Sequence, residues 1–137
     1  MTRKSSISSP KASKPRVLVV EDEIFVAWHL EATLRDLDCA VCGLVPDGES
    51  AVDRASRLHA DLVLMDINLQ GTIDGVEAAR RIREHGDTPV IFITAYSDPA
   101  TLRRIRELVP DAPVLAKPIS PGVLKHAVSV ALADATP

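Results

Sequence analysis

Five short apolar runs alternate with five stretches of helical periodicity along most of this 137-residue chain. Short apolar runs between polar residues are typical of buried strands, whereas apolar residues that recur every three or four positions are typical of amphipathic helices. Strands that alternate with helices predict βαβ units and a parallel sheet. The expected strands are 16–20, 40–45, 61–65, 90–94 and 114–116, and the expected helices are 24–37, 48–59, 75–85, 99–109 and 121–133.

Right-handed crossovers would place these helices on both faces of an open sheet, which is a doubly wound α/β architecture. We predict a (βα)5 sheet with the flavodoxin-like strand order 2-1-3-4-5. Asp98 and Ser120 each stand directly before a proline, which marks the starts of the last two helices. Asp74 is expected to cap the third helix, with no chemical role.

Composition is consistent with one α/β domain. Hydrophobic residues make up 46% of the chain and aromatic residues only 3%, so the core must be mainly aliphatic. Residues 1–15 are rich in Ser and Lys, lack periodicity and are expected to form a disordered tail. The predicted domain covers residues 16–133, and 134–137 would be a short C-terminal tail.

The charge distribution argues against nucleic acid as a partner. The net charge is −3, although residues 1–15 carry four basic residues and no acid, so the predicted domain is more acidic than the whole chain. Direct DNA binding is not expected, because neutralised phosphates supply much of such affinity. No apolar run approaches the roughly 20 residues of a membrane helix, and no signal-peptide core is present. We therefore expect a cytoplasmic protein with no membrane partner.

Cys39 and Cys42 form a C-x-x-C pattern in an apolar stretch that is predicted to be a strand. Residues three apart in a strand lie roughly 10 Å apart and point to opposite faces, which prevents a disulfide or a shared metal. We expect both cysteines to serve packing.

Polar side chains stand at the carboxyl ends of four of the predicted strands: Glu21 and Asp22, Asp66, Thr94 and Lys117. Ends of parallel strands meet at one edge of the sheet, where ligands bind. Three carboxylates gathered there would repel one another unless a cation joined them. Mg²⁺ prefers such oxygen ligands together with substrate phosphate. A carboxylate beside Mg²⁺ and an ammonium group can attack phosphorus.

Five motifs, four of them at these strand ends, resemble those of response-regulator receiver domains in two-component phosphorelays. The resemblance spans about residues 16–133, and the order and spacing of the motifs are specific. The motifs are Val19-Val20-Glu21-Asp22-Glu23, Leu64-Met65-Asp66-Ile67-Asn68, Asp74-Gly75, Phe92-Ile93-Thr94-Ala95 and Lys117-Pro118.

The resemblance implies a phosphorylation site with Mg²⁺ as its cofactor. Asp66 would accept the phosphoryl group, and Asp22 and Asp66 would bind Mg²⁺ directly. The backbone carbonyl of Asn68 would be another ligand, and Glu21 would act through water. Lys117 would contact the phosphoryl group.

The same resemblance implies a switch beside the phosphorylation site. The Thr94 hydroxyl would move toward the phosphoryl group, and Ala95 would leave the approach to Asp66 open. The Lys117-Pro118 peptide bond would be cis. Val114 departs from the family, where Tyr or Phe is common at this position, so Tyr96 is the candidate switch-surface residue. Glu21 replaces an aspartate and should leave metal binding intact.

The predicted function is that of a stand-alone phosphoacceptor rather than an enzyme with a separate substrate. Its partners would be a sensor histidine kinase or a histidine phosphotransfer protein and a downstream protein, and a homodimer stays open. One alternative is a Mg²⁺ phosphatase of the haloacid-dehalogenase kind, although Asn68 stands where that class needs an acid. The other alternative is an interaction module that has lost phosphorylation, against which the intact set of site residues argues.

Two groups of residues are candidates for partner contacts. Phe25 and Trp28 lie near the start of the first helix, and at least one of them is expected to face the sheet. An exposed aromatic there would anchor a docking helix of a kinase or phosphotransfer protein. Arg103, Arg104 and Arg106 are expected to form a solvated face of the fourth helix, with a docking surface as the alternative.

Overall fold

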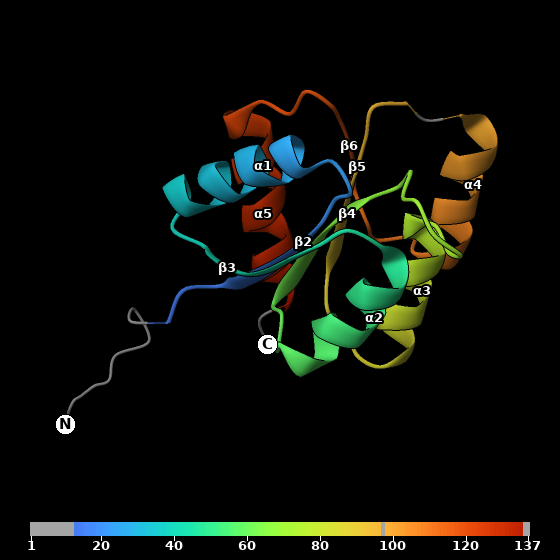
Figure 1. The fold of residues 1–137 in the computed structure, drawn as a ribbon, viewed down its shortest axis with the longest axis horizontal. Helices are drawn as coiled ribbons and strands as arrows, with labels where there is room; N and C mark the ends of the chain where they lie inside the picture. Colours follow the sequence, from blue (N-terminus) through green and yellow to red (C-terminus); the bar gives the residue numbers. More distant parts are fainter. Residues whose placement is uncertain (1–12, 97, 136–137) are drawn as a thin grey trace.

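The computed structural model describes residues 13–96 and 98–135, which form alternating strands and helices (Figure 1). The strands are β2 (Arg16–Val20), β3 (Ala40–Val45), β4 (Leu62–Asp66), β5 (Val90–Thr94) and β6 (Val114–Ala116). The helices are α1 (Ile24–Asp36), α2 (Gly48–Arg57), α3 (Gly75–Glu84), α4 (Pro99–Leu108) and α5 (Pro121–Ala135).

The strands form one parallel sheet in the order β3-β2-β4-β5-β6. Counted along the chain, this is the predicted order 2-1-3-4-5, and the doubly wound α/β fold is confirmed. The chain leaves β2 toward β3 on one side and later returns to β4 on the other side. This reversal opens a crevice beyond the carboxyl ends of β2 and β4, where ligands bind in such sheets.

Helices cover both faces of the sheet and bury two aliphatic cores. Helices α1 and α5 cover one face, and α2, α3 and α4 cover the other (Figure 1). The central strands are buried on both sides: Val17 and Val19 face α1 and α5, whereas Leu18 and Val20 face the other three helices. Continuous apolar runs of this kind are expected where both faces of a parallel sheet are covered.

Some element boundaries differ from the prediction. Strand β4 runs one residue later, so that Asp66 is its last residue. Helix α2 ends at Arg57 because the chain turns at His59, which has a φ of 52°. Helix α5 continues to Ala135, so two residues of the predicted C-terminal tail are helical. Residues 1–12 of the predicted N-terminal tail, and residues 136 and 137, lie outside the described residues.

The predicted helix caps are confirmed. Asp98 Oδ1 accepts a hydrogen bond from the Thr101 amide at 2.7 Å, and Ser120 Oγ accepts one from the Val123 amide at 3.2 Å. Asp74 caps α3 through the Glu77 amide at 2.9 Å. These bonds satisfy amide groups that a helix start otherwise leaves unpaired.

The two cysteines serve packing, as predicted. Cys39 belongs to the core under α1 and α5, while Cys42 packs against the core on the opposite face, and both thiols are free. Among residues 13–96 and 98–135, no helix is both long and apolar enough to cross a membrane.

Candidate functional site

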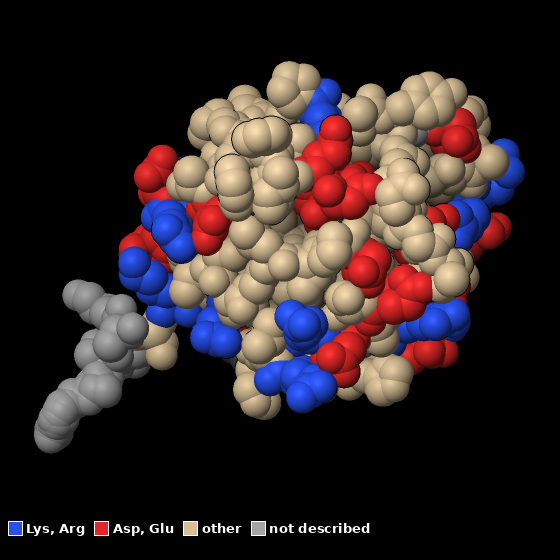
Figure 2. All heavy atoms as spheres, viewed as in Figure 1, with Lys and Arg blue, Asp and Glu red and all other residues tan. Residues whose placement is uncertain are grey.

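The candidate site lies at the carboxyl edge of the sheet, where four strands deliver polar side chains. Glu21 and Asp22 follow β2, Asp66 ends β4, Thr94 ends β5 and Lys117 follows β6. Figure 2 shows acidic side chains gathered over this edge on the face in view. The parallel arrangement thus brings together residues that lie up to 96 positions apart in the chain.

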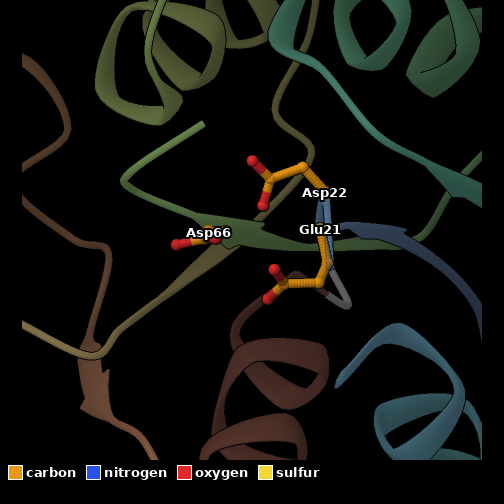
Figure 3. Close-up of side chains that lie close together, drawn as sticks. All are labelled: Glu21, Asp22 and Asp66. Carbon is orange, nitrogen blue, oxygen red and sulfur yellow. The ribbon is translucent and has the colours of Figure 1, made fainter. Parts of the chain in front are cut away.

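Three carboxylates form a compact cluster in the crevice. Glu21, Asp22 and Asp66 each offer an oxygen within 4.8 Å of the others (Figure 3). Glu21 and Asp66 are only 4% and 3% exposed, whereas Asp22 is half-buried. Buried carboxylates this close together repel one another, so the cluster needs cationic partners.

Lys117 supplies one such cation. Its Nζ lies 2.7 Å from Glu21 Oε1 and 3.5 Å from Asp66 Oδ2. Burial opposes the charge on Lys117, but the contacts with Glu21 and Asp66 outweigh it and raise the lysine pKa. Burial dominates for Glu21 and raises its pKa from 4.5 to about 7, against the hydrogen bond from Lys117. One lysine therefore does not balance the acidic cluster.

Backbone groups orient the two buried carboxylates. The Asn68 amide donates to Asp66 Oδ1 at 3.1 Å, and the Glu23 amide donates to Glu21 Oε2 at 3.2 Å. Asp66 is therefore held from two sides, by an amide at one oxygen and by Lys117 at the other. A carboxylate fixed in this way is chemically able to act as a nucleophile.

Gly75 allows α3 to start against the end of β4. A Cβ atom on Gly75 would lie 2.1 Å from the backbone oxygen of Asp66, and the Gly75 amide donates to the Ile67 carbonyl at 3.0 Å. This contact excludes any side chain at position 75. Glycine in the Asp74-Gly75 motif therefore has a steric reason, in addition to the capping role of Asp74.

The Thr94 hydroxyl is buried and bonded to the loop that follows β5. Its Oγ1 donates to the Tyr96 carbonyl, accepts from the Tyr96 amide at 3.1 Å, and accepts from Asn68 Nδ2 at 3.1 Å. The contact with the Asn68 side chain was not predicted, since the resemblance implied a role only for its backbone carbonyl. The available signal was the position of Asn68, two residues after Asp66.

Comparison with known proteins decides the family. The sequence profile described as "Response regulator receiver domain" matches residues 17–129. The chain belongs to this family of receiver domains. Receiver domains of response regulators act in two-component signalling.

Two curated relatives of this receiver domain are named as regulators. The chain is 33% identical over 117 residues to the transcriptional regulatory protein PdtaR of Mycobacterium tuberculosis, covering 85% of this chain and 56% of that protein. It is 39% identical over 83 residues to the response regulator ArlR of Staphylococcus aureus, covering 61% of this chain and 37% of that protein. The chain thus spans about half the length of the first relative and less of the second.

Solved structures agree with the receiver fold. A signal receiver domain of a modulated diguanylate cyclase from Desulfovibrio desulfuricans G20 is 36% identical, with a TM-score of 0.83 over 90% of this chain and 97% of that one. A response regulator receiver protein from Sinorhizobium medicae WSM419 is 27% identical, with a TM-score of 0.80 over 91% and 99% of the two chains.

The remaining predicted residues of the receiver domain follow β5 and β6. Ala95 and Tyr96 are exposed, and the Tyr96 side chain is 71% accessible to solvent. The Lys117-Pro118 peptide bond is cis, the isomer that the resemblance implies.

The expectation that Phe25 or Trp28 faces the sheet is wrong. Phe25 is 78% exposed and Trp28 is 52% exposed, and their rings meet edge to face at 5.6 Å. The buried side of α1 consists of Ala27, Leu30 and Leu34. Residues 25 and 28 lie on another side of a helix with 3.6 residues per turn, because each is two positions from an inward-facing residue.

Proposed function

We propose that this receiver domain accepts a phosphoryl group on Asp66 from the phosphohistidine of a sensor histidine kinase or a histidine phosphotransfer protein. The observation that carries the proposal is the position of Lys117 Nζ, 3.5 Å from Asp66 Oδ2 and 2.7 Å from Glu21 Oε1. A fixed cation at this point would stabilise the negative charge of the transferring group. Phosphorylation would change the conformation that a downstream protein contacts.

The acidic cluster fits Mg²⁺. Lys117 contacts two of the three carboxylates, Glu21 and Asp66, and the oxygens of all three are ligands of the kind that Mg²⁺ prefers. Asp22 and Asp66 would hold the ion directly together with the Asn68 backbone carbonyl, and Glu21 would act through water. Bound there, Mg²⁺ would neutralise charge on the phosphoryl oxygens and align them with Asp66.

Asp66 would act as the nucleophile. One of its oxygens would form the bond to phosphorus while the phosphorus–nitrogen bond of the phosphohistidine breaks. The ring nitrogen would keep the electron pair, and the ring would take up one proton from solvent to leave as neutral imidazole. Attack of water on phosphorus would later regenerate Asp66 and release inorganic phosphate. The chain would thus catalyse only its own phosphorylation and dephosphorylation, which makes it a switch and not an enzyme with a separate substrate.

Thr94 and Tyr96 would carry the signal out of the pocket. The Thr94 hydroxyl has a single proton, which it donates to the Tyr96 carbonyl. If the hydroxyl turns toward a phosphoryl oxygen, that bond is lost and the loop before α4 is released. Since Val114 has no ring that could move, we expect the change to centre on Tyr96 and the start of α4.

Phe25 and Trp28 would anchor the phosphodonor partner. A histidine that reaches Asp66 must bring its own helix over the mouth of the pocket. The exposed pair Phe25 and Trp28 would offer that helix an apolar surface to pack against. A groove of about 500 Å³ continues from Phe25 to Pro118 and Ile119, with Lys117 in its wall. Replacing Phe25 by Ala should slow phosphotransfer from a kinase while phosphorylation by acetyl phosphate stays unchanged.

The sequence supports two further parts of the proposal. We expect no direct DNA binding, because the folded part of the chain is acidic. We also propose a cytoplasmic location, in line with the lack of an apolar run of membrane-helix length. The downstream partner would be a protein, with a second copy of the chain as one candidate.

The central experiment is intact-mass analysis after incubation with acetyl phosphate and Mg²⁺. The proposal expects one phosphoryl adduct on the wild-type protein, none on Asp66→Asn, and no turnover of phosphomonoesters. Turnover of phosphomonoesters would favour a phosphatase of the haloacid-dehalogenase kind, and no adduct in the presence of bound Mg²⁺ would favour an interaction module. An adduct on Asp66→Asn at the wild-type rate would refute Asp66 as the acceptor.

A further inference from the structure

The Asn68 side chain links the end of β4 to the loop that follows β5. Its Nδ2 lies 3.1 Å from Thr94 Oγ1 and 3.4 Å from the Tyr96 carbonyl oxygen. Only a donor can face a carbonyl oxygen, so the nitrogen of this amide, and not its oxygen, must point toward the loop. The side chain is therefore oriented by its contacts.

These contacts leave the Thr94 hydroxyl with no free hydrogen-bonding capacity. A hydroxyl has one proton and two acceptor lone pairs. The proton goes to the Tyr96 carbonyl, and the lone pairs accept from the Tyr96 amide and from Asn68 Nδ2. To donate elsewhere, Thr94 must give up the Tyr96 carbonyl and rotate against the other two bonds.

We propose that the Asn68 carboxamide is a positioning residue that holds Thr94 in its unphosphorylated arrangement, with the hydroxyl proton on the Tyr96 carbonyl and away from Asp66. This role belongs to the side chain and is separate from that of the backbone carbonyl. It rests on the proposed function, because it sets how readily Thr94 turns toward a phosphoryl group on Asp66.

Removal of the carboxamide should therefore favour the phosphorylated arrangement. Asn68→Ala deletes the donor and keeps the backbone carbonyl. Beryllofluoride, which stands in for the phosphoryl group, should then bind about three- to tenfold more tightly, which is the range that one neutral hydrogen bond supplies. If Asn68 instead assisted the phosphoryl group by donating to it, the same variant would bind beryllofluoride more weakly.

The test is a beryllofluoride titration at saturating Mg²⁺, followed by amide chemical shifts. Wild type, Asn68→Ala, Thr94→Ala and the double variant form a thermodynamic cycle. Gln70→Ala removes an exposed amide from the same loop and is the matched control. We expect the gain from Asn68→Ala to vanish in the Thr94→Ala background. An unchanged or weaker affinity for Asn68→Ala, or an equal gain without Thr94, would overturn the proposal.

A second measurement separates this proposal from the function on which it rests. The Tyr96 amide donates to Thr94 Oγ1 at 3.1 Å, so its hydrogen exchange reports the arrangement without any phosphoryl analogue. Exchange should be several-fold faster in Asn68→Ala and unchanged in Gln70→Ala. Faster exchange with no beryllofluoride binding by wild type would support the role of Asn68 and refute the proposed function. Wild-type binding with unchanged exchange would refute the role of Asn68 alone.

Discussion

Arg104 donates two hydrogen bonds to Asp74, at 2.8 and 3.4 Å, and so ties α4 to the N-terminus of α3. Burial tends to raise the pKa of Asp74, but the hydrogen bonds from Arg104 and from the Glu77 amide outweigh it and lower the pKa from 3.8. Helix α4 follows the Thr94 loop, and α3 starts beside Asp66. The ion pair therefore joins the two segments on either side of the pocket.

This ion pair can be measured by a double-mutant cycle of Arg104→Gln and Asp74→Asn in urea unfolding. Asparagine still caps a helix, so Asp74→Asn removes mainly the charge. Both side chains are about 40% exposed, so we expect a coupling free energy of only about 0.5 kcal/mol. It should persist above pH 4 and disappear as the pH falls through the lowered pKa of Asp74. Arg103→Gln combined with Asp74→Asn is the control and should give additive effects. Strictly additive effects of Arg104→Gln and Asp74→Asn at pH 7 would contradict the coupling.

Glu21 should destabilise the metal-free protein at alkaline pH. Its pKa is raised from 4.5 to about 7, so the folded state binds more protons than the unfolded state between these values. Its contribution to the free energy of unfolding therefore falls as the pH rises through this window. We expect Glu21→Gln to stabilise the protein by roughly 1–3 kcal/mol at pH 8 and much less at pH 5.

Urea unfolding at pH 5 and pH 8 without Mg²⁺ would measure this effect of Glu21. Glu23→Gln is the control, because Glu23 is an exposed neighbour of the cluster. The same stability difference at both pH values would show that the charge of Glu21 is not the cause.

Asp22→Ala should remove most Mg²⁺ binding. Asp22 is the most accessible of the three clustered carboxylates, and the site offers few other ligands from the protein. We expect Mg²⁺ affinity to fall at least about tenfold, since metal sites depend strongly on each ligand. Asp53→Ala, on the exposed surface of α2, is the control. Wild-type affinity in Asp22→Ala would place the ion elsewhere.

Thr94→Ala should uncouple the pocket from the loop before α4. Beryllofluoride should shift the amide signals of residues 95–106 in wild type, because Thr94 releases the Tyr96 carbonyl. A single hydrogen bond to a charged acceptor is worth about 1–3 kcal/mol, so the shift in wild type should be partial without a partner. In Thr94→Ala these signals should stay near their free positions. Equal shifts in both proteins would mean that a residue other than Thr94 couples the pocket to the loop before α4.

Gly75→Ala should disturb the proposed phosphorylation site directly. The added Cβ would lie 2.1 Å from the Asp66 backbone oxygen, so the start of α3 or the end of β4 must move. We expect a loss of about 2 kcal/mol or more in unfolding free energy, typical of overpacking, and slower phosphorylation by acetyl phosphate. Gly86→Ala is the control, because a Cβ there meets nothing within 4 Å. Equal stability of the two variants would contradict this steric account.

The sequence by itself determined the sheet and most of the site. Apolar runs such as 16–20 and 90–94, with acids and a threonine directly after or at their ends, specify strands. Helices between consecutive strands specify a parallel sheet, and parallel strands end at the same edge. Glu21, Asp22, Asp66 and Lys117 can therefore be placed together from the sequence alone. Local capping chemistry likewise predicted that helices start at Asp98 and Ser120.

Only the tertiary structure decided which side chains meet across the pocket. Whether Asn68 turns its amide toward Thr94, or Arg104 reaches Asp74, depends on how far apart two loops and two helices come to lie. The sequence predicted a solvated face for Arg104, because it does not show that Asp74 lies within reach. It also did not show that both Phe25 and Trp28 lie on the exposed side of α1. Hydrophobic periodicity specifies which positions are buried, but contacts among the remaining polar and exposed side chains depend on distances that no local pattern encodes.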